Sequence, residues 1–182
     1  MTLKTDRNTF FPNTSFTTPV LFLTFNRPDT TQQVFSEIRQ AQPPSLYVAG
    51  DGPRPEQSNE AEICEIVRSI ATNVDWDCEV KTLFRDHNLG CRLAVSQAIS
   101  WFFENEPEGI ILEDDCLPSQ SFFWFAKNCW KISGTTNKLE QFADFTQTNW
   151  ITNQALHTFF QDTCVFGGGL DGGGLLKGMI PI

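Results

Sequence analysis

Residues 20–42, VLFLTFNRPDTTQQVFSEIRQAQ, decide the fold class because they place a buried strand directly before an amphipathic helix. The first six residues form a nearly continuous apolar run between two prolines, which is typical of a strand buried on both faces. Apolar side chains then recur at helical spacing, at Val34, Phe35 and Ile38. Asp29 or Thr30 is expected to cap this helix. The segment predicts one strand–helix unit.

The same strand–helix order continues along the chain. Further strands are expected at residues 45–52, 79–84 and 109–112, and further helices at residues 60–73 and 92–104. The apolar face of the second helix is expected to consist of Ile63, Ile66, Val67 and Ile70. Strands that alternate with helices in this way predict an α/β fold with a parallel sheet and helices on both faces.

The chain of 182 residues is long enough for one domain with a substantial core. Residues 1–18 are predicted to be a polar lead-in and residues 19–163 to form the domain, with a helix over residues 119–130. Residues 164–182 are rich in glycine, so they are interpreted as a linker-like tail rather than a packed element.

The composition excludes several classes of protein. A net charge of −9 argues against a general nucleic-acid binder, which needs a basic face. The six cysteines form no C-x-x-C pair and accompany no histidine cluster, so a zinc site is not expected. They are interpreted as free thiols of a cytoplasmic protein. No stretch of 18 apolar residues and no secretory signal pattern is present, and no transmembrane segment is expected.

Polar side chains follow each of the four predicted strands. Ligands of parallel α/β sheets bind at the carboxyl ends of the strands, so these side chains predict a binding site. A loop is often polar for no functional reason, but four successive strand ends of this kind favour a site. The candidate residues are Asn26, Arg27, Asp51, Arg85, Asn88, Gly90, Glu113, Asp114 and Asp115.

Three consecutive acids, Glu113, Asp114 and Asp115, end the fourth predicted strand. Two like charges about 5 Å apart repel by about 3 kcal/mol at an effective dielectric of about 20, so water or a cation must offset this cost. Carboxylate oxygens suit Mg²⁺ or Mn²⁺. Strand alternation is expected to place Glu113 and Asp115 on one face and Asp114 on the other, with Asp115 holding the ion. The alternative is a solvated acidic loop.

The other candidates also have two interpretations each. Asp51 could accept hydrogen bonds from a base or sugar, or belong to an ordinary Asp-Gly turn. Arg27 could pair with a phosphate or form a surface ion pair. Asn88 and Gly90 precede a predicted helix whose N-terminus favours an anion. His87, in the same turn, is interpreted as a solvated histidine.

Four motifs occur in the order TFNRP, DGPR, RDHNLGCRLAVSQAISWFF and GIILEDDCLPSQSFFWF. Together they resemble the N-terminal half of a nucleotide-sugar-dependent glycosyltransferase of the GT-A fold. The nearest resemblance is to family 2-like bacterial enzymes, including hemolysin-like members, and the acidic triplet resembles the E-D-D form of the D-x-D motif in N-acetylglucosaminyltransferase I. The match covers residues 19–130. It implies a Rossmann-like sheet, a nucleoside diphosphate sugar donor and a divalent metal.

The resemblance also implies a role for each candidate residue. Asp51 would contact the nucleotide base, and Asn26 and Arg27 would line the nucleotide pocket. Glu113 and Asp114 would face ribose and sugar hydroxyls. The residues implied to lie near the diphosphate or the sugar are Arg85, Asn88 and Gly90. The metal, Mn²⁺ or Mg²⁺, would be held by Asp115 and would neutralise the leaving diphosphate.

The catalytic base of such enzymes is an acid well after the metal motif, and it is not identified here. Residues 131–182 lack the Trp- and Arg-rich segment of these enzymes, and the chain is expected to be truncated at its C-terminus, without its acceptor half. The acceptor, whether glycan, lipid or protein, stays unknown, as do the donor base and sugar. The late acids, none of them in a matching motif, are Glu140, Asp144, Asp162 and Asp171.

Three alternatives to a complete enzyme remain open. The first is a truncated, non-catalytic fragment that binds a nucleotide sugar. The second is a nucleotidyltransferase, which would favour a glycine-rich phosphate loop after the first strand; TFNRPDTTQ has no such glycines. The third is a binding or interaction module that uses its many aromatic residues.

Overall fold

The computed structural model describes residues 16–124, residue 126 and residues 164–167. Strands and helices alternate through the first range, as predicted, and residues 120–124 are also helical. The elements are β1 (Val20–Thr24), α1 (Pro28–Ala41), β2 (Ser45–Gly50), α2 (Glu60–Ala71), β3 (Glu79–Phe84), α3 (Cys91–Asn105), β4 (Glu108–Glu113) and β5 (Cys164–Gly167).

The strands form one sheet in the order β3-β2-β1-β4-β5. The first four strands of this order are parallel, and in the central register Phe22 lies opposite Val48 on one side and Leu112 on the other. From β1 the chain builds outward to β3, then returns past β1 to place β4 on the opposite side. The order therefore reverses between β1 and β4, which is the position where ligands bind in open α/β sheets. This α/β arrangement is compatible with a Rossmann-like fold.

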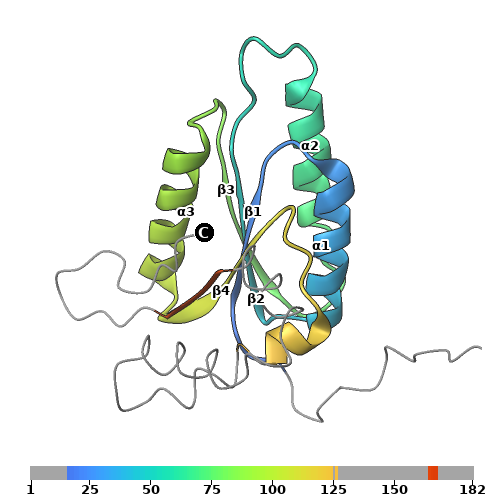
Figure 1. Ribbon diagram of the computed structural model, residues 1–182, viewed down its shortest axis with the longest axis vertical. Coiled ribbons are helices and arrows are strands. Elements are labelled where there is room, and N and C mark those ends of the chain that lie inside the picture. Colours follow the sequence, from blue (N-terminus) through green and yellow to red (C-terminus); the bar gives the residue numbers. More distant parts are fainter. Residues whose placement is uncertain (1–15, 125, 127–163, 168–182) are drawn as a thin grey trace, which may run out of the picture.

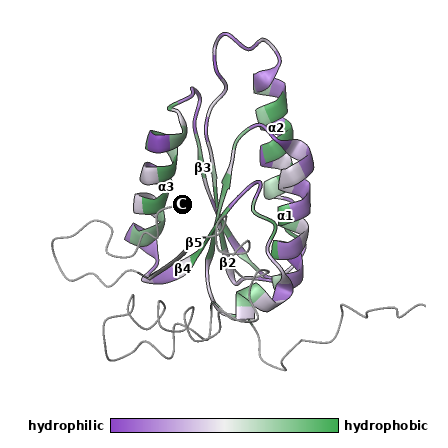
Figure 2. Ribbon diagram, in the orientation of Figure 1, coloured by the Kyte–Doolittle hydropathy of each residue, from purple (hydrophilic) through white to green (hydrophobic). Residues whose placement is uncertain are grey.

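The two faces of the sheet carry separate hydrophobic cores, because successive strand residues point to opposite faces. Val20 and Phe22 of β1 pack toward α1, α2 and the helical residues from 120 onward. Leu21 and Leu23 pack toward α3. Figure 1 shows α1 and α2 on one side of the sheet and α3 on the other, and each helix carries both hydrophobic and hydrophilic residues in Figure 2. The prediction of helices on both faces is confirmed.

The predicted cap of the first helix is wrong. Pro28 occupies the first helical position, so the N-cap is Arg27, without a side-chain cap. Proline suits this position because its fixed φ is helical and the missing N–H would have no partner there. Asp29 and Thr30 lie inside the first turn, where the acid favours the positive end of the helix dipole.

The interpretation of residues 164–182 as a tail without packed structure is also wrong in part. Residues 164–167 form β5, which pairs antiparallel with β4 and places Val165 opposite Ile110. A four-residue strand between polar and glycine-rich segments is too short to show a periodic pattern, so no sequence signal marks it. Residues 1–15, 125, 127–163 and 168–182 lie outside the described part of the chain.

In the described part of the chain, no helix is long and apolar enough to cross a membrane. Four cysteines of this part are free thiols, as predicted: Cys64, Cys78, Cys91 and Cys116.

Candidate functional site

A cleft of about 340 Å³ opens where the parallel strands end, between the sheet and the N-terminal half of α3. Its lining includes most of the candidate residues: Arg27, Asp51, Arg85, Asn88, Gly90, Glu113 and Asp114. Asn26 and Asp115 lie nearby but do not line it. The structure therefore brings together residues that follow all four parallel strands. Arg27 and Asp114, for example, are 87 positions apart in the sequence.

The cleft has an apolar floor and a polar rim. The floor is made by side chains at the ends of the strands and by the facing side of α3: Leu23, Ala49, Leu83, Ala94, Val95 and Ala98. The rim carries three arginines, Arg27, Arg54 and Arg85. Small side chains on both walls leave the space open, and apolar walls with a few polar groups are typical of small-molecule sites.

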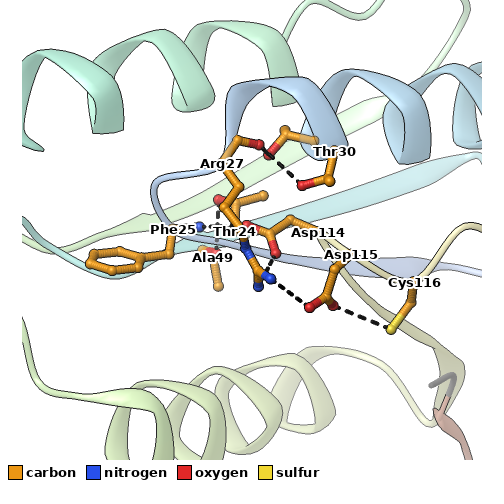
Figure 3. Close-up of polar contacts among 9 residues, drawn as sticks. Thr24, Phe25, Arg27, Thr30, Ala49, Asp114, Asp115 and Cys116 are labelled. Carbon is orange, nitrogen blue, oxygen red and sulfur yellow. Dashed lines mark hydrogen bonds and ion pairs between the residues drawn. The ribbon is translucent and has the colours of Figure 1, made fainter. Parts of the chain in front are cut away.

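Arg27 supplies the cation that offsets the acidic triplet. Its Nη2 lies 2.6 Å from Asp114 Oδ1, and its Nη1 donates to Asp115 Oδ2 at 2.5 Å. Figure 3 shows the guanidinium between the two carboxylates. Asp114 is buried, and its Oδ2 also accepts a hydrogen bond from the Phe25 N–H at 3.3 Å.

The predicted alternation of the three acids is wrong beyond Glu113. β4 ends at Glu113, and the next two residues form a turn, so Asp114 and Asp115 are no longer related by strand geometry. Both can therefore reach the same guanidinium. Asp115 is about half exposed, with a side-chain exposure of 44%, whereas that of Asp114 is 3%.

Burial and the neighbouring charges shift the pKa values of the groups in this cluster. Burial raises the pKa of Asp114, although the positive charge of Arg27 and the Phe25 N–H oppose the rise. Partial burial disfavours the charged form of Arg27, but Asp114 and Asp115 outweigh it, and the pKa of Arg27 is raised. Burial, with the neighbouring Asp115, raises the pKa of Cys116 to about 12. The cysteine is therefore a thiol, whose Sγ lies 3.6 Å from Asp115 Oδ1.

The donor set fits a divalent cation held by one or two carboxylates and the phosphates of a ligand, which is how Mg²⁺ is usually bound. Asp115 is the exposed oxygen donor for this purpose. In the described residues no group of three or more His, Cys, Asp and Glu side chains converges, so an all-protein metal cage is not present there. A cation at Asp115 would share this carboxylate with Arg27.

Asp51 holds the loop between β3 and α3. Its Oδ1 accepts hydrogen bonds from the N–H groups of Gly52 at 2.9 Å and Leu89 at 3.0 Å. Its Oδ2 accepts from Asn88 Nδ2 at 3.0 Å and the Gly90 N–H at 3.1 Å. A carboxylate offers about four acceptor positions, and these four donors use them. Contact with a nucleotide base, the role implied by resemblance, would compete with these bonds.

Two glycines make this loop arrangement possible. A Cβ at Gly52 would collide with the backbone nitrogen and carbonyl carbon of His87, so only glycine allows the two loops to approach. Gly90, with φ of 78°, provides the left-handed backbone from which α3 starts. His87 itself is exposed, in agreement with its interpretation as a solvated residue.

The N-terminus of α3 borders the cleft, since Gly90, Cys91 and Ala94 line it. α3 has no side-chain cap and no acid in its first turn. Arg85 lies in the preceding loop, half-buried, and its side chain makes no hydrogen bond or ion pair with another described residue. This end of the cleft therefore combines a helix dipole and an arginine, which favour an anion.

Sequence reasoning missed Glu60 and Arg54. Glu60 is the first residue of α2 and is 4% exposed. It accepts hydrogen bonds from Arg54 Nη2 at 2.5 Å, from the Arg54 N–H at 2.6 Å and from Asn26 Nδ2 at 2.7 Å. These bonds from Arg54 hold the pKa of Glu60 at about 2, although burial opposes the shift. Asn26 therefore contacts Glu60 rather than the cleft.

The sequence does not mark the pairing of Glu60 with Arg54, because acidic residues are common in the first turns of helices. The late acids of the sequence, Glu140, Asp144, Asp162 and Asp171, lie outside the described residues. No protein-family model matches the chain, and no curated protein is significantly similar to it.

Proposed function

We propose that this chain is a glycosyltransferase that binds a nucleoside diphosphate sugar in the cleft at the ends of the parallel strands. The observation that carries the proposal is the convergence of the candidate residues, since seven of them line one cleft at the point where the strand order reverses. The motifs that resemble GT-A glycosyltransferases supply these residues. The activity itself is inferred from that resemblance.

Two groups of charged residues at the cleft suit a nucleoside diphosphate. Arg27 and Asp114 line the cleft, and the exposed carboxylate of Asp115 lies beside it in contact with Arg27, so an arginine and a carboxylate there can serve phosphate oxygens and a cation. Arg85 and the N-terminus of α3 provide positive charge at the rim. The apolar floor between them suits a base or a sugar ring.

A divalent cation, when bound, would offset the negative charge of the leaving diphosphate. The chain's own residues would bind and orient the donor. Arg27 would pair with a phosphate as a fork of two donors once it leaves Asp115. The loop fixed by Asp51 would keep Asn88 and Gly90 at the cleft wall.

Calorimetric titration with UDP and GDP, with and without Mn²⁺, tests donor binding. The wild-type chain is expected to bind one nucleotide in the presence of Mn²⁺, and Asp115→Ala is expected to abolish the metal dependence. Asp77→Ala is the control, because this exposed acid precedes β3 at the opposite end of the sheet. Absence of binding to the folded wild-type chain would refute the proposal.

A second candidate is nucleotide-sugar binding without transfer. It is favoured by the Arg27–Asp115 pair, which provides a cation at the acidic triplet without a metal. The release of UDP or GDP from the matching nucleotide sugar, followed over time, separates the two functions. Steady release that depends on Mn²⁺, with the sugar passing to water because no acceptor is supplied, shows that the chain cleaves the sugar–phosphate bond as a transferase does, whereas binding of an intact donor indicates the second candidate.

A further inference from the structure

Glu60 joins two loops that form the rim of the cleft. Asn26 belongs to the loop after β1, and Arg54 belongs to the loop after β2. Both donate to Glu60 Oε1, at 2.7 Å from Asn26 Nδ2 and at 2.5 Å from Arg54 Nη2. Glu60 Oε2 accepts the Arg54 backbone N–H and, at 3.0 Å, its Nε. The buried carboxylate therefore fixes both the backbone and the side chain of Arg54.

Arg54 is held on one side and open on the other. Its side chain is 43% exposed, lines the cleft, and lies over the ring of Phe25 at 5.6 Å from its centroid. Phe25 also lines the cleft, and its ring extends away from Asp114 and Asp115 (Figure 3). Nη1 of Arg54 makes no hydrogen bond with another described residue. Glu60 and Phe25 thus leave the guanidinium only one free edge.

A stabilising role alone accounts poorly for this arrangement. Burying a carboxylate is costly, and a buried ion pair is often no more stabilising than apolar residues of similar volume. Here the buried partner holds a cation at the edge of a cleft, where a fixed donor costs little entropy when it binds a ligand. The cluster is therefore better explained as preorganisation of Arg54.

We propose that Glu60 is a positioning residue, which acts through Arg54 to fix a guanidinium donor for the oxygen atoms of the bound nucleotide. The inference rests on the proposed nucleotide binding in this cleft and adds the residues that position its recognition. Arg54 contacts the nucleotide, and Glu60 sets the direction of its free edge. Asn26 links the loop after β1 to the same carboxylate.

A double-mutant cycle measured by calorimetry tests this inference, with Mn²⁺ and the nucleotide, UDP or GDP, that the wild-type chain binds. Glu60→Gln and Arg54→Met are each expected to weaken binding about tenfold. The double variant is expected to bind no more weakly than Arg54→Met alone, because Glu60 acts through Arg54. Glu65→Gln is the matched control, since Glu65 pairs with Arg68 on α2 and is 70% exposed.

Arg54→Lys extends the test to a variant that keeps the positive charge, and it applies also if Glu60→Gln does not fold. Lysine lacks the planar fork that Glu60 holds, so weaker nucleotide binding is expected although the charge remains. Wild-type affinity of Arg54→Lys would overturn the inference, as would a Glu60→Gln effect that persists in full in the Arg54→Met background. Failure of the wild-type chain to bind either nucleotide would instead refute the proposed function, and the inference with it.

Discussion

Replacing Asp51 by asparagine should release the loop between β3 and α3. The carboxylate accepts four N–H groups, two at each oxygen. Asparagine has nearly the same shape but keeps one oxygen, and its NH₂ group then faces two donors. Hydrogen bonds to a charged group contribute roughly 1.5–3 kcal/mol each, so losing two of them at a half-exposed site should cost about 3 kcal/mol. For a chain of this size, this corresponds to a melting temperature lower by about 9 °C.

Two measurements check this prediction. Urea unfolding, followed by circular dichroism, gives the loss of stability in Asp51→Asn relative to Asp86→Asn, an exposed acid of the loop itself. Hydrogen exchange of the Leu89 and Gly90 amides reports the bonds directly, because both amides donate to Asp51. A change in stability below about 0.5 kcal/mol, with unchanged exchange at both amides, would refute the role of Asp51 as the anchor of this loop.

Three further predictions concern the core, the charge cluster and the cleft. Gly109→Ala should destabilise the chain by about 2 kcal/mol in thermal unfolding, because a Cβ there would overlap the buried ring of Phe102; unchanged stability would contradict this packing. The pKa of Glu60 is about 2 in the folded chain against an ordinary 4.5, so its stabilisation is present above pH 4.5 and is lost as the pH falls toward 2. Stability measured in urea should therefore fall more steeply over this range in the wild type than in Glu60→Gln, and equal slopes would contradict the pairing. Maleimide should modify Cys91, which is exposed at the cleft, before the buried Cys116, and bound nucleotide should slow the reaction of Cys91 as followed by peptide mass spectrometry. Equal labelling with and without saturating nucleotide would place the ligand elsewhere.

The order of the parallel strands and helices was predictable because each element carries its own signal. β1 is fully buried, so an unbroken apolar run marks it, and the turn residues around it mark its ends. The edge strand β3 was predicted with the bounds Glu79–Phe84 that it has in the structure. Its alternating pattern suits a half-buried strand.

The buried face of α2 was predicted only in part. Of the expected residues, Val67 is buried and Ile63 and Ile70 are half-buried, but Ile66 is 51% exposed, and the helix also buries Glu60, Cys64 and Ala71. A buried glutamate contradicts any hydrophobicity pattern, because only its partners in other loops make its burial possible. Tertiary contacts therefore determine which face of α2 is buried. Glu60 and Arg54, which lie at the rim of the cleft, were missed for the same reason.

For the site, the sequence predicted most of the residues that converge but not what they contact. Parallel strands place all their carboxyl ends at one edge, so topology alone brought Arg27, Asp51 and Asp114 together. Their partners depend on the path of each loop. The turn after Glu113 brings Asp114 and Asp115 to one guanidinium, and Gly52 brings Asp51 to the loop before α3.

The ion pairs of Arg27 with Asp114 and Asp115 have a consequence for the folding of the protein. If a metal ion alone offset the charge of the acidic triplet, the chain would need that metal to fold, because the carboxylates would repel one another without it. Here a tethered cation reaches both carboxylates across 87 positions of sequence between Arg27 and Asp114. The loops after β1 and β4 can therefore close on each other during synthesis whatever the supply of divalent ions, and the chain is expected to fold in the presence of a chelator.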